Sequence, residues 1–508
     1  MLARAIAFTK QHLNEPIDPE DDLEHIALRG ALGALDRYTT VFSGRGSEDF
    51  RIRFEGKLSG IGARIGRRDG DLIAVRVFPE SPAEKGGLKD GDAILSIDGD
   101  PTQPLSVEEA VSRIRGRSGT LVSLGLQRGS DTKEKLDIEI TRGEVMIPSV
   151  ESKHLEGAKR IGYVQVYQVS RETAQEFHDR VKELGRLDGL VMDMRGNTGG
   201  SMVAAAQLAD QFLDSQMIVR TVTRDGLPPD ARSRIAADPE VDFDMPLAIL
   251  VDPQTASAAE IISGALQPLG NVTLIGQTTF GKGLVQQVLP MRDDNLLKLT
   301  IAEYLLSDDR AINEKGIEPG IRLYPVPESR LGALANVPAG SIPYVRGTGE
   351  DDAFPVDVGA TVLRQPKEQA LVEVRKRADA DIAKHLAALG VPWSNQRGPS
   401  DVPLPVPLVI DVVAPKFVSG EAGKVKITVT NKNDFELPDV WLALDASAEY
   451  LDNKVAGLGA LAPGGSATTE LELVPPDGIS VRRHPIDVLV AAGDRPLAKK
   501  RIVLDVSA

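Results

Sequence analysis

The sequence predicts a multidomain α/β protein in which a central α/β core follows a compact β-rich domain and precedes a β-sandwich. Its 508 residues exceed what one hydrophobic core usually organises. From residue 158 onward, apolar runs alternate with stretches of helical periodicity, which is typical of a buried parallel sheet covered by helices. Residues 402–508 contain only short strand-like runs separated by turn residues.

A helical segment is expected at the start of the chain, in residues 1–56. Apolar residues recur there at helical spacing between Leu23 and Leu35, behind an acidic first turn. Residues 57–143 change to short β runs broken by glycine, with one helical stretch near 107–114. We expect this second part to form one compact domain, because its length lies in the usual domain range.

The predicted α/β core spans residues 144–395. Its first buried strands are expected at 160–166, 187–194, 246–252 and 271–276. A long helical stretch follows a segment rich in glycine and proline, and the core ends before residue 402. The even strand spacing of 402–508 favours an immunoglobulin-like β-sandwich, although the cysteine pair of true immunoglobulin domains is absent.

Composition excludes several classes of function. The net charge of −15 and the lack of a basic run argue against a nucleic-acid partner. The absence of cysteine excludes disulfides, thiolate zinc sites and thiol catalysis. The six histidines are scattered without the spacing of a helical metal site, so we expect neither a metal nor another cofactor.

Membrane and targeting segments are not expected either. No apolar run reaches the length of about eighteen residues that a membrane-spanning helix needs. The first residues lack the apolar core and the cleavage site of a signal peptide. These patterns indicate either a cytosolic protein or one whose targeting segment has been removed.

Ser257 is the first candidate for chemistry, because it follows an apolar strand and precedes a helix of small residues. That position is the carboxyl end of the sheet, where helix N–H groups can meet an oxyanion. A lone serine there is more often an N-cap. A nucleophilic serine also needs a base, and no histidine occurs between residues 179 and 384.

Lys282 can supply that base. It lies between Gly281 and Gly283 and precedes an apolar strand, so its amine can enter a crowded, dry site. Burial must then lower its pKa from about 10.4 to about 7, which corresponds to about 4 kcal/mol of desolvation. Alone, this sequence is more often a turn with a solvated charge, but together the two segments predict a dyad of Ser257 and Lys282.

Four stretches of the sequence together resemble a known family. TASAAEIISGAL at 255–266 and TFGKGLVQ at 279–286 resemble the motifs of the carboxy-terminal processing, or tail-specific, serine peptidases. LVMDMRGNTGG at 190–200 resembles the family's strand, glycine turn and helix, and SPAEKGGLKDGDAILSIDGD at 81–100 resembles its PDZ domain. The resemblance implies a PDZ domain at 57–143 and a catalytic core related to the ClpP and crotonase folds.

The resemblance also implies residue roles. Ser257 would be the nucleophile, Lys282 the general base, and Gln286 the group that orients the lysine. Alternation along a strand places 282, 284 and 286 on one face, which suits that geometry. The backbone N–H groups of Gly199 and Ala258 would form the oxyanion hole.

Glu260 and Pro268 lie at two further positions of the family pattern. Glu260 matches an acidic position of the motif and is expected to brace the helix in a supporting role. Some members carry an aspartate eleven residues after the serine, but this chain has Pro268 there. A third catalytic residue at that position is therefore not expected.

The segment LSGIGARIG resembles the loop of PDZ domains that binds a terminal carboxylate through successive N–H groups. The helix near 107–114 would form the other wall of the groove. The expected partners are protein or peptide substrates, bound through their C-terminal tails. The residues expected to hold the tail are Leu58, Ser59, Gly60, Ile61 and Gly62.

Other functions stay open. The same fold also serves non-catalytic binding, so a scaffold protein or a latent protease gated by its PDZ domain is the alternative. A nucleotide site at RGNTGG is disfavoured, because the lysine of a Walker motif is missing. The resemblance implies a periplasmic or otherwise extracytoplasmic location, with no signal segment in this chain, and leaves open a homo-oligomeric state.

Overall fold

The computed structural model describes most of the chain. The described residues are 23–44, 46–47, 50, 57–68, 70–78, 80–128, 134–223, 234–292, 295–307, 309–346, 352–389, 391, 406–446, 454–476, 482–493 and 495–507. Within these ranges, no helix has both the length and the apolar character needed to cross a membrane. The part of the predicted helical segment before residue 23 lies outside the described residues.

The first β-rich domain is a six-stranded antiparallel sheet in the order β3-β4-β5-β7-β8, with β6 beside β5. Helix α5 begins at an intact capping box of Ser106 and Glu109, and it lies against β3 at the sheet edge. One core of buried aliphatic residues fills the space between the sheet and the helices. The elements are β3 (Ala63–Arg68), β4 (Asp71–Val77), α4 (Pro82–Lys85), β5 (Ala93–Ile97), β6 (Asp100–Pro101), α5 (Val107–Ile114), β7 (Leu121–Arg128) and β8 (Glu134–Thr141).

The central core is a seven-stranded sheet in the order β10-β11-β12-β15-β16-β19-β20. All neighbouring strands are parallel except β10 and β11. Every residue of β12 and β15 is buried, as the continuous apolar runs predict. The strands are β10 (Val150–Leu155), β11 (Ile161–Val166), β12 (Gly189–Asp193), β15 (Leu247–Val251), β16 (Val272–Gly276), β19 (Ile321–Pro327) and β20 (Ile342–Arg346).

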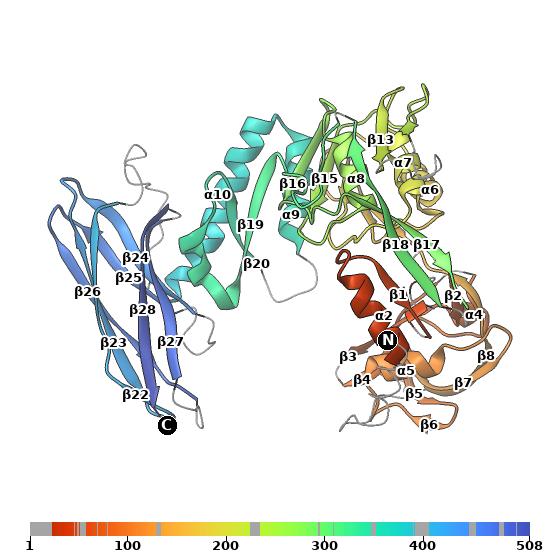
Figure 1. The fold of residues 1–508 in the computed structure, drawn as a ribbon, viewed down its shortest axis with the longest axis horizontal. Coiled ribbons are helices and arrows are strands. Elements are labelled where there is room, and N and C mark those ends of the chain that lie inside the picture. The colour runs from red at the N-terminus through yellow and green to blue at the C-terminus, as the bar shows by residue number, and fades with distance from the viewer. Residues whose placement is uncertain are drawn as a thin grey trace.

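Helices cover both faces of this sheet (Figure 1). One face packs against α6 (Thr173–Glu183), α7 (Met202–Asp210) and α8 (Ala258–Leu266). The other face packs against α9 (Ala353–Arg364) and α10 (Lys367–Ala387). Alternate residues of one strand therefore belong to different cores, as Leu190 and Val191 of β12 do.

A second, antiparallel sheet lies beside α8. Its order is β1-β18-β13-β14, with β17 paired to β18. The β17–β18 hairpin extends from the α/β core toward the first β-rich domain (Figure 1). The strands are β1 (Thr40–Phe42), β13 (Met217–Val222), β14 (Arg234–Ala236), β17 (Leu284–Pro290) and β18 (Leu296–Leu306), and helix α2 (Leu23–Gly33) contacts β1. A separate antiparallel pair is formed by β2 (Lys57–Gly60) and β9 (Gly143–Met146).

The C-terminal region is β-rich, as predicted. A three-stranded sheet, β21-β23-β26, and a five-stranded sheet, β22-β28-β27-β24-β25, enclose one apolar core. The strands are β21 (Leu408–Val413), β22 (Phe417–Val418), β23 (Gly423–Asn431), β24 (Leu437–Ala446), β25 (Val455–Leu461), β26 (Ser466–Leu473), β27 (Arg482–Ala492) and β28 (Arg495–Ser507).

A further apolar cluster joins this region to the α/β core. Trp441 of β24 is fully buried against the 3-10 helix η2 (Glu328–Asn336) and the end of α10, where Ile382 and Leu386 lie. Its indole N–H donates to the carbonyl oxygen of Gly493 at 2.9 Å. The two parts thus share a packed interface.

Candidate active site

Ser257 lies in a sharp turn between β15 and α8. Its backbone φ is 57° and its ψ is −120°, a conformation that residues other than glycine rarely adopt. Strained strand-to-helix turns of this kind are used to present a nucleophile above a sheet. The small residues that follow, Ala258 and Ala259, are fully buried and allow the helix to pack closely beneath the turn.

Glu260 ties the serine turn to the lysine segment. Its carboxylate is completely buried, and its Oε2 accepts the backbone N–H groups of Ser257 at 2.8 Å and Lys282 at 2.9 Å. Its Oε1 accepts the N–H of Gly281 at 2.8 Å and the hydroxyl of Thr279 at 2.5 Å. Four donors compensate the buried charge. Glu260 therefore links two separate segments as well as bracing its own helix.

Tyr304 of β18 makes a second link between the same segments. Its hydroxyl oxygen lies 3.0 Å from the carbonyl oxygen of Ser257 and 2.6 Å from that of Lys282. Burial raises the pKa of Tyr304 well above its ordinary value, and nearby Glu260 adds to the effect. The phenol therefore stays protonated and can donate. Tyr304 is absent from the residues predicted from sequence, and no local motif marks it.

The amine of Lys282 is held in a partly dry environment. It donates to Oε1 of Gln286 at 2.9 Å and lies 5.0 Å from the ring centre of Tyr38. Burial, helped by the positive charge of Lys298 and opposed by Glu260, lowers the pKa of Lys282 to about 8. A useful fraction of this amine is neutral near physiological pH.

Gln286 connects the lysine to the start of the chain. Its Oε1 accepts from Lys282, while its Nε2 donates to the carbonyl oxygen of Tyr38 at 3.1 Å. Tyr38 precedes β1, which pairs with β18. The structure therefore brings Gln286 to the lysine as the motif spacing suggests, and it adds Tyr38, which sequence reasoning did not select.

The predicted oxyanion donors lie side by side. Gly199 has a φ of +93°, and a Cβ added to it would lie 2.8 Å from the backbone nitrogen of Ala258 and 2.6 Å from the carbonyl oxygen of Ala256. Only glycine fits there. In this structure, however, the N–H of Gly199 donates to Oδ1 of the buried Asn197 at 2.9 Å. One of the two predicted donors is thus already paired.

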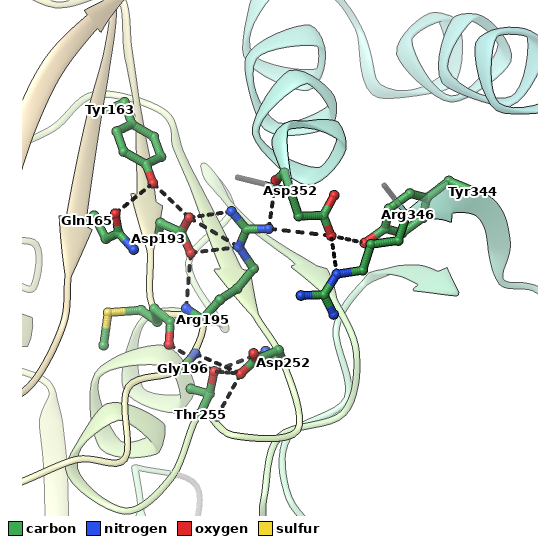
Figure 2. A network of polar contacts seen from close by, with 11 residues as sticks. Tyr163, Gln165, Asp193, Arg195, Gly196, Asp252, Thr255, Tyr344, Arg346 and Asp352 are labelled. Carbon is green, nitrogen blue, oxygen red and sulfur yellow. Dashed lines mark hydrogen bonds and ion pairs between the residues drawn. The ribbon is translucent and has the colours of Figure 1, made fainter. Parts of the chain in front are cut away.

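A polar network holds the turn that contains Gly199. Arg195 donates through Nε and Nη2 to the buried Asp193, at 2.9 and 2.7 Å, and through Nη1 to the carbonyl oxygen of Asp352 at 3.0 Å. Figure 2 shows this arginine clamped between the end of β12 and the residue that precedes α9. The ion pair fixes the chain just before the glycine turn.

Asp252 joins that turn to the serine turn. Its Oδ1 accepts the N–H of Gly196 at 3.1 Å and the N–H of Thr255 at 2.9 Å (Figure 2). The N–H of Ala256 donates to the carbonyl oxygen of Asn197 at 2.9 Å. The two turns therefore form one connected unit.

A cavity of about 750 Å³ opens in front of these groups. It has a mixed lining, in which the candidate catalytic atoms are surrounded by apolar side chains and one additional cation. The lining includes Ser257, Ala258, Gly199, Lys282, Gln286, Tyr304, Ile261, Leu284, Val285, Val288, Phe42, Phe50 and Lys298. The arrangement suits acyl transfer to a serine in a pocket that can accept an extended peptide. Across the described part of the chain, no cluster of His, Asp or Glu is suited to hold a metal ion.

The predicted tail-binding segment is only partly a loop. Leu58, Ser59 and Gly60 belong to β2, which pairs with β9, and the hydroxyl of Ser59 donates to the carbonyl oxygen of Gly116 at 2.7 Å. Ile61 and Gly62 follow as irregular backbone before β3. This segment therefore adjoins the end of α5, and β3 is the edge strand of its sheet.

Comparison with known proteins agrees with this architecture. A family model described as Peptidase family S41 matches residues 160–323, and one described as PDZ domain matches residues 73–128. Carboxy-terminal processing protease CtpB of Bacillus subtilis (strain 168) is 35% identical over 61% of this chain and 64% of its own length. The carboxyl-terminal-processing protease of Picosynechococcus sp. (strain ATCC 27264 / PCC 7002 / PR-6) is 33% identical over 61% of this chain and 75% of its own.

A third relative, the carboxy-terminal-processing protease of Bartonella bacilliformis (strain ATCC 35685 / KC583 / Herrer 020/F12,63), is 31% identical over 69% of this chain and 81% of its own length. The chain belongs to peptidase family S41 and carries a PDZ domain, which confirms the predicted resemblance. It spans 64% of the length of each of the two Bacillus subtilis relatives that it matches.

Proposed function

We propose that this chain is a serine endopeptidase that cleaves protein substrates near their C termini. Ser257 is the nucleophile and Lys282 the general base. The observation that carries the proposal is the half-buried amine of Lys282, whose pKa is lowered to about 8 and which lines the same cavity as Ser257. The backbone N–H groups of the two residues are tied together through Glu260. The names of the related proteins support the same reaction.

In this mechanism the neutral amine takes the proton of the Ser257 hydroxyl as the oxygen attacks the peptide carbonyl. Lys282 then returns the proton to the leaving amine, and an acyl-enzyme forms that water hydrolyses by the same route. Gln286 holds the amine in place through its Oε1. The backbone N–H of Ala258 stabilises the developing oxyanion. The N–H of Gly199 joins it after its hydrogen bond to Oδ1 of Asn197 breaks and a hydrogen bond to the substrate oxygen forms.

The PDZ domain, on this proposal, binds the substrate's C-terminal tail. The edge of β3 can accept an added strand, and α5 lies against β3 as the second wall. The N–H groups of Ile61 and Gly62 lie in the irregular segment where a terminal carboxylate would be held. Tail binding there would bring the end of a protein toward the cavity that contains Ser257.

We also propose finer fold assignments for two parts of the chain. The parallel sheet with helices on both faces supports a catalytic core of the ClpP and crotonase type. The two sheets that enclose one core in the C-terminal region support an immunoglobulin-like β-sandwich.

A latent peptidase is the second candidate, and one observation favours it. The Gly199 N–H is paired with Asn197, so the oxyanion hole offers one donor instead of two in this arrangement. A latent enzyme would cleave only after tail binding rearranges the glycine turn.

Cleavage of a fluorescence-quenched peptide with a free C terminus tests the proposal. Ser257→Ala and Lys282→Met should each lower the turnover number by more than about a thousandfold, since the serine and its base act as one unit. Ser466→Ala, on an exposed position of β26, is the matched control and should be as active as the unaltered enzyme. Full turnover by either dyad variant would refute the assignment. Activity that requires an added tail peptide would select the latent form.

A further inference from the structure

A second lysine, Lys298, faces the same cavity as the dyad. It lies on β18, where it pairs with Val288 of β17 on one side and with Thr40 of β1 on the other. Directly paired residues share one face of a sheet, and so do residues two apart along a strand. Lys298 therefore projects from the same face as Val288, which also lines the cavity.

No acidic partner neutralises this lysine within the described residues. Its ammonium group lies 5.2 Å from the ring centre of Phe42, which is stacked on Phe50. Asp36 exerts a weaker attraction from a distance, and its carboxylate already accepts the N–H groups of Tyr38 and Thr39. A cation–π contact compensates a half-buried ammonium group only in part.

The surroundings of Lys298 are partly dry. Partial burial lowers the pKa of Lys298 from its ordinary value, and Asp36 opposes this effect. Lys298 is half-buried, and a lysine side chain that is withdrawn from water usually has a partner. A cation of this kind that faces a cavity is suited to bind an anionic group of a ligand.

The location of Lys298 indicates which part of a substrate it would meet. The β17–β18 hairpin extends from the core toward the PDZ domain (Figure 1). Its tip lies beyond the pair Pro290 and Leu296, and Lys298 is only two residues from Leu296. Lys298 therefore lies nearer the tip than Gln286 does. A tail that is held by the PDZ domain and cleaved at Ser257 would pass this stretch with residues on the C-terminal side of the cut.

We propose that Lys298 is a specificity-determining residue that binds a carboxylate of the substrate on the C-terminal side of the cleaved bond. This inference rests on the proposed peptidase function. The carboxylate is either an Asp or Glu side chain or the terminal carboxylate of a short tail, and both offer the same two oxygen acceptors. Phe42 and Phe50 would pack against the apolar part of the bound residue.

Five pairs of fluorescence-quenched peptides test the inference. In four pairs, all with an amidated C terminus, a single Glu is exchanged for Gln at one of the first four positions after the cut. In the fifth pair, a Gln-containing peptide carries either a free or an amidated C terminus. The quantity compared is the ratio of kcat/KM for the charged and uncharged members of each pair, measured within each enzyme variant, so an overall loss of rate does not affect it.

The unaltered enzyme should prefer the charged member of one pair by about tenfold, and the pair in which this occurs identifies the source of the carboxylate. Lys298→Met should bring that ratio close to one, Lys298→Arg should keep most of it, and high salt should reduce it. Lys153→Met is the matched control, since Lys153 also lies over an aromatic ring, 5.1 Å from the centre of Tyr163, on the exposed edge strand β10. It should keep the full ratio.

Two results would overturn the inference while leaving the proposed function intact. One is cleavage of both members of each pair at equal rates by the unaltered enzyme. The other is a preference that persists in folded Lys298→Met, or that is lost equally in Lys153→Met. Absence of cleavage of all these peptides, together with no difference from Ser257→Ala, would instead contradict the peptidase function itself.

Discussion

Ser257 and Lys282 share one hydrogen-bond acceptor, because their backbone N–H groups donate to the same oxygen, Oε2 of Glu260, at 2.8 and 2.9 Å. The separation of the two candidate catalytic segments is therefore set by a side chain that contributes no reacting atom. Tyr304 repeats the link on the carbonyl side of the same two residues. The segments that carry the two residues of the dyad are thus both fixed to the buried carboxylate of Glu260 and to the buried phenol of Tyr304.

Replacing Glu260 with Gln should damage both stability and turnover. An amide has one oxygen, so its NH₂ group would replace either Oε2, which accepts two backbone N–H groups, or Oε1, which accepts a backbone N–H and a hydroxyl. In either orientation, two donors lose their acceptor. We expect a loss of about 2–4 kcal/mol in the free energy of unfolding and at least a tenfold fall in kcat. Urea unfolding and peptide cleavage measure the two effects.

The matched control is Glu172→Gln. Glu172 is exposed and makes no side-chain cap bond at the start of α6. It should change neither quantity appreciably. If Glu260→Gln behaved like Glu172→Gln in both assays, the linking role of the carboxylate would be wrong.

The pH dependence of kcat/KM should follow the neutral form of Lys282. Because burial holds its pKa at about 8, activity should rise with pH and reach half of its plateau near that value. Lys298→Met removes a like charge, so the pKa of Lys282 should increase and the inflection should move to higher pH. A pH–rate profile of both enzymes checks this. An inflection that stays in place in the variant would contradict the electrostatic coupling of the two lysines.

Gly199→Ala should abolish most activity. The added methyl group would collide with the backbone at Ala256 and Ala258, where the oxyanion must be stabilised, in addition to straining the positive φ of 93°. Gly185→Ala is a suitable control, since Gly185 also has a positive φ, 69°, but nothing lies within 4 Å of its added Cβ.

Both variants should lose about 1 kcal/mol of stability from backbone strain, and the collision should cost Gly199→Ala more. Only Gly199→Ala should also lose at least about a hundredfold in kcat. Thermal unfolding and cleavage kinetics separate the two effects. Equal activity of the two alanine variants would show that the crowding at Gly199 is not functionally important.

Trp441→Ala should loosen the joint between the C-terminal region and the α/β core. The side chain is fully buried against η2 and α10, so its removal leaves a large cavity that should cost about 3–5 kcal/mol. Limited proteolysis should then separate the two parts faster than in the unaltered protein. Val413→Ala, at a side chain that is 68% exposed, is the control. An unchanged cutting rate in Trp441→Ala would mean that the interface does not hold the two parts together.

Local patterns predicted those parts of the site that lie within one motif. Ser257, Glu260 and Ala258 fall in one strand-to-helix turn, and Lys282 and Gln286 fall on one face of a short segment, so spacing was informative. Tyr38 and Tyr304 could not be found in this way. Each reaches the dyad only because β1 and β17 both pair with β18, and that pairing is a property of the folded chain.

The segment at 322–358, which is rich in glycine and proline, contains most of strand β19 and all of strand β20, and neither strand was predicted there. Proline usually argues against an interior strand, because it lacks the N–H of the ladder. Strand β19 tolerates Pro325 and Pro327 because its pairing with β16 involves only Ile321 and Arg322. Beyond that point it pairs on one side only, with β20, so the missing donors leave no gap in the ladder on the other side.

The hydrogen bond from Gln286 to the carbonyl oxygen of Tyr38 has a practical consequence for the design of recombinant fragments. A recombinant fragment trimmed to begin at the PDZ domain would retain every atom that reacts, yet its lysine would lose the anchor that aims it. Such a fragment should fold and still work poorly. Proteolytic cleavage of the chain, or an added tag, ahead of β1 is therefore expected to affect activity, as a substitution in the dyad would.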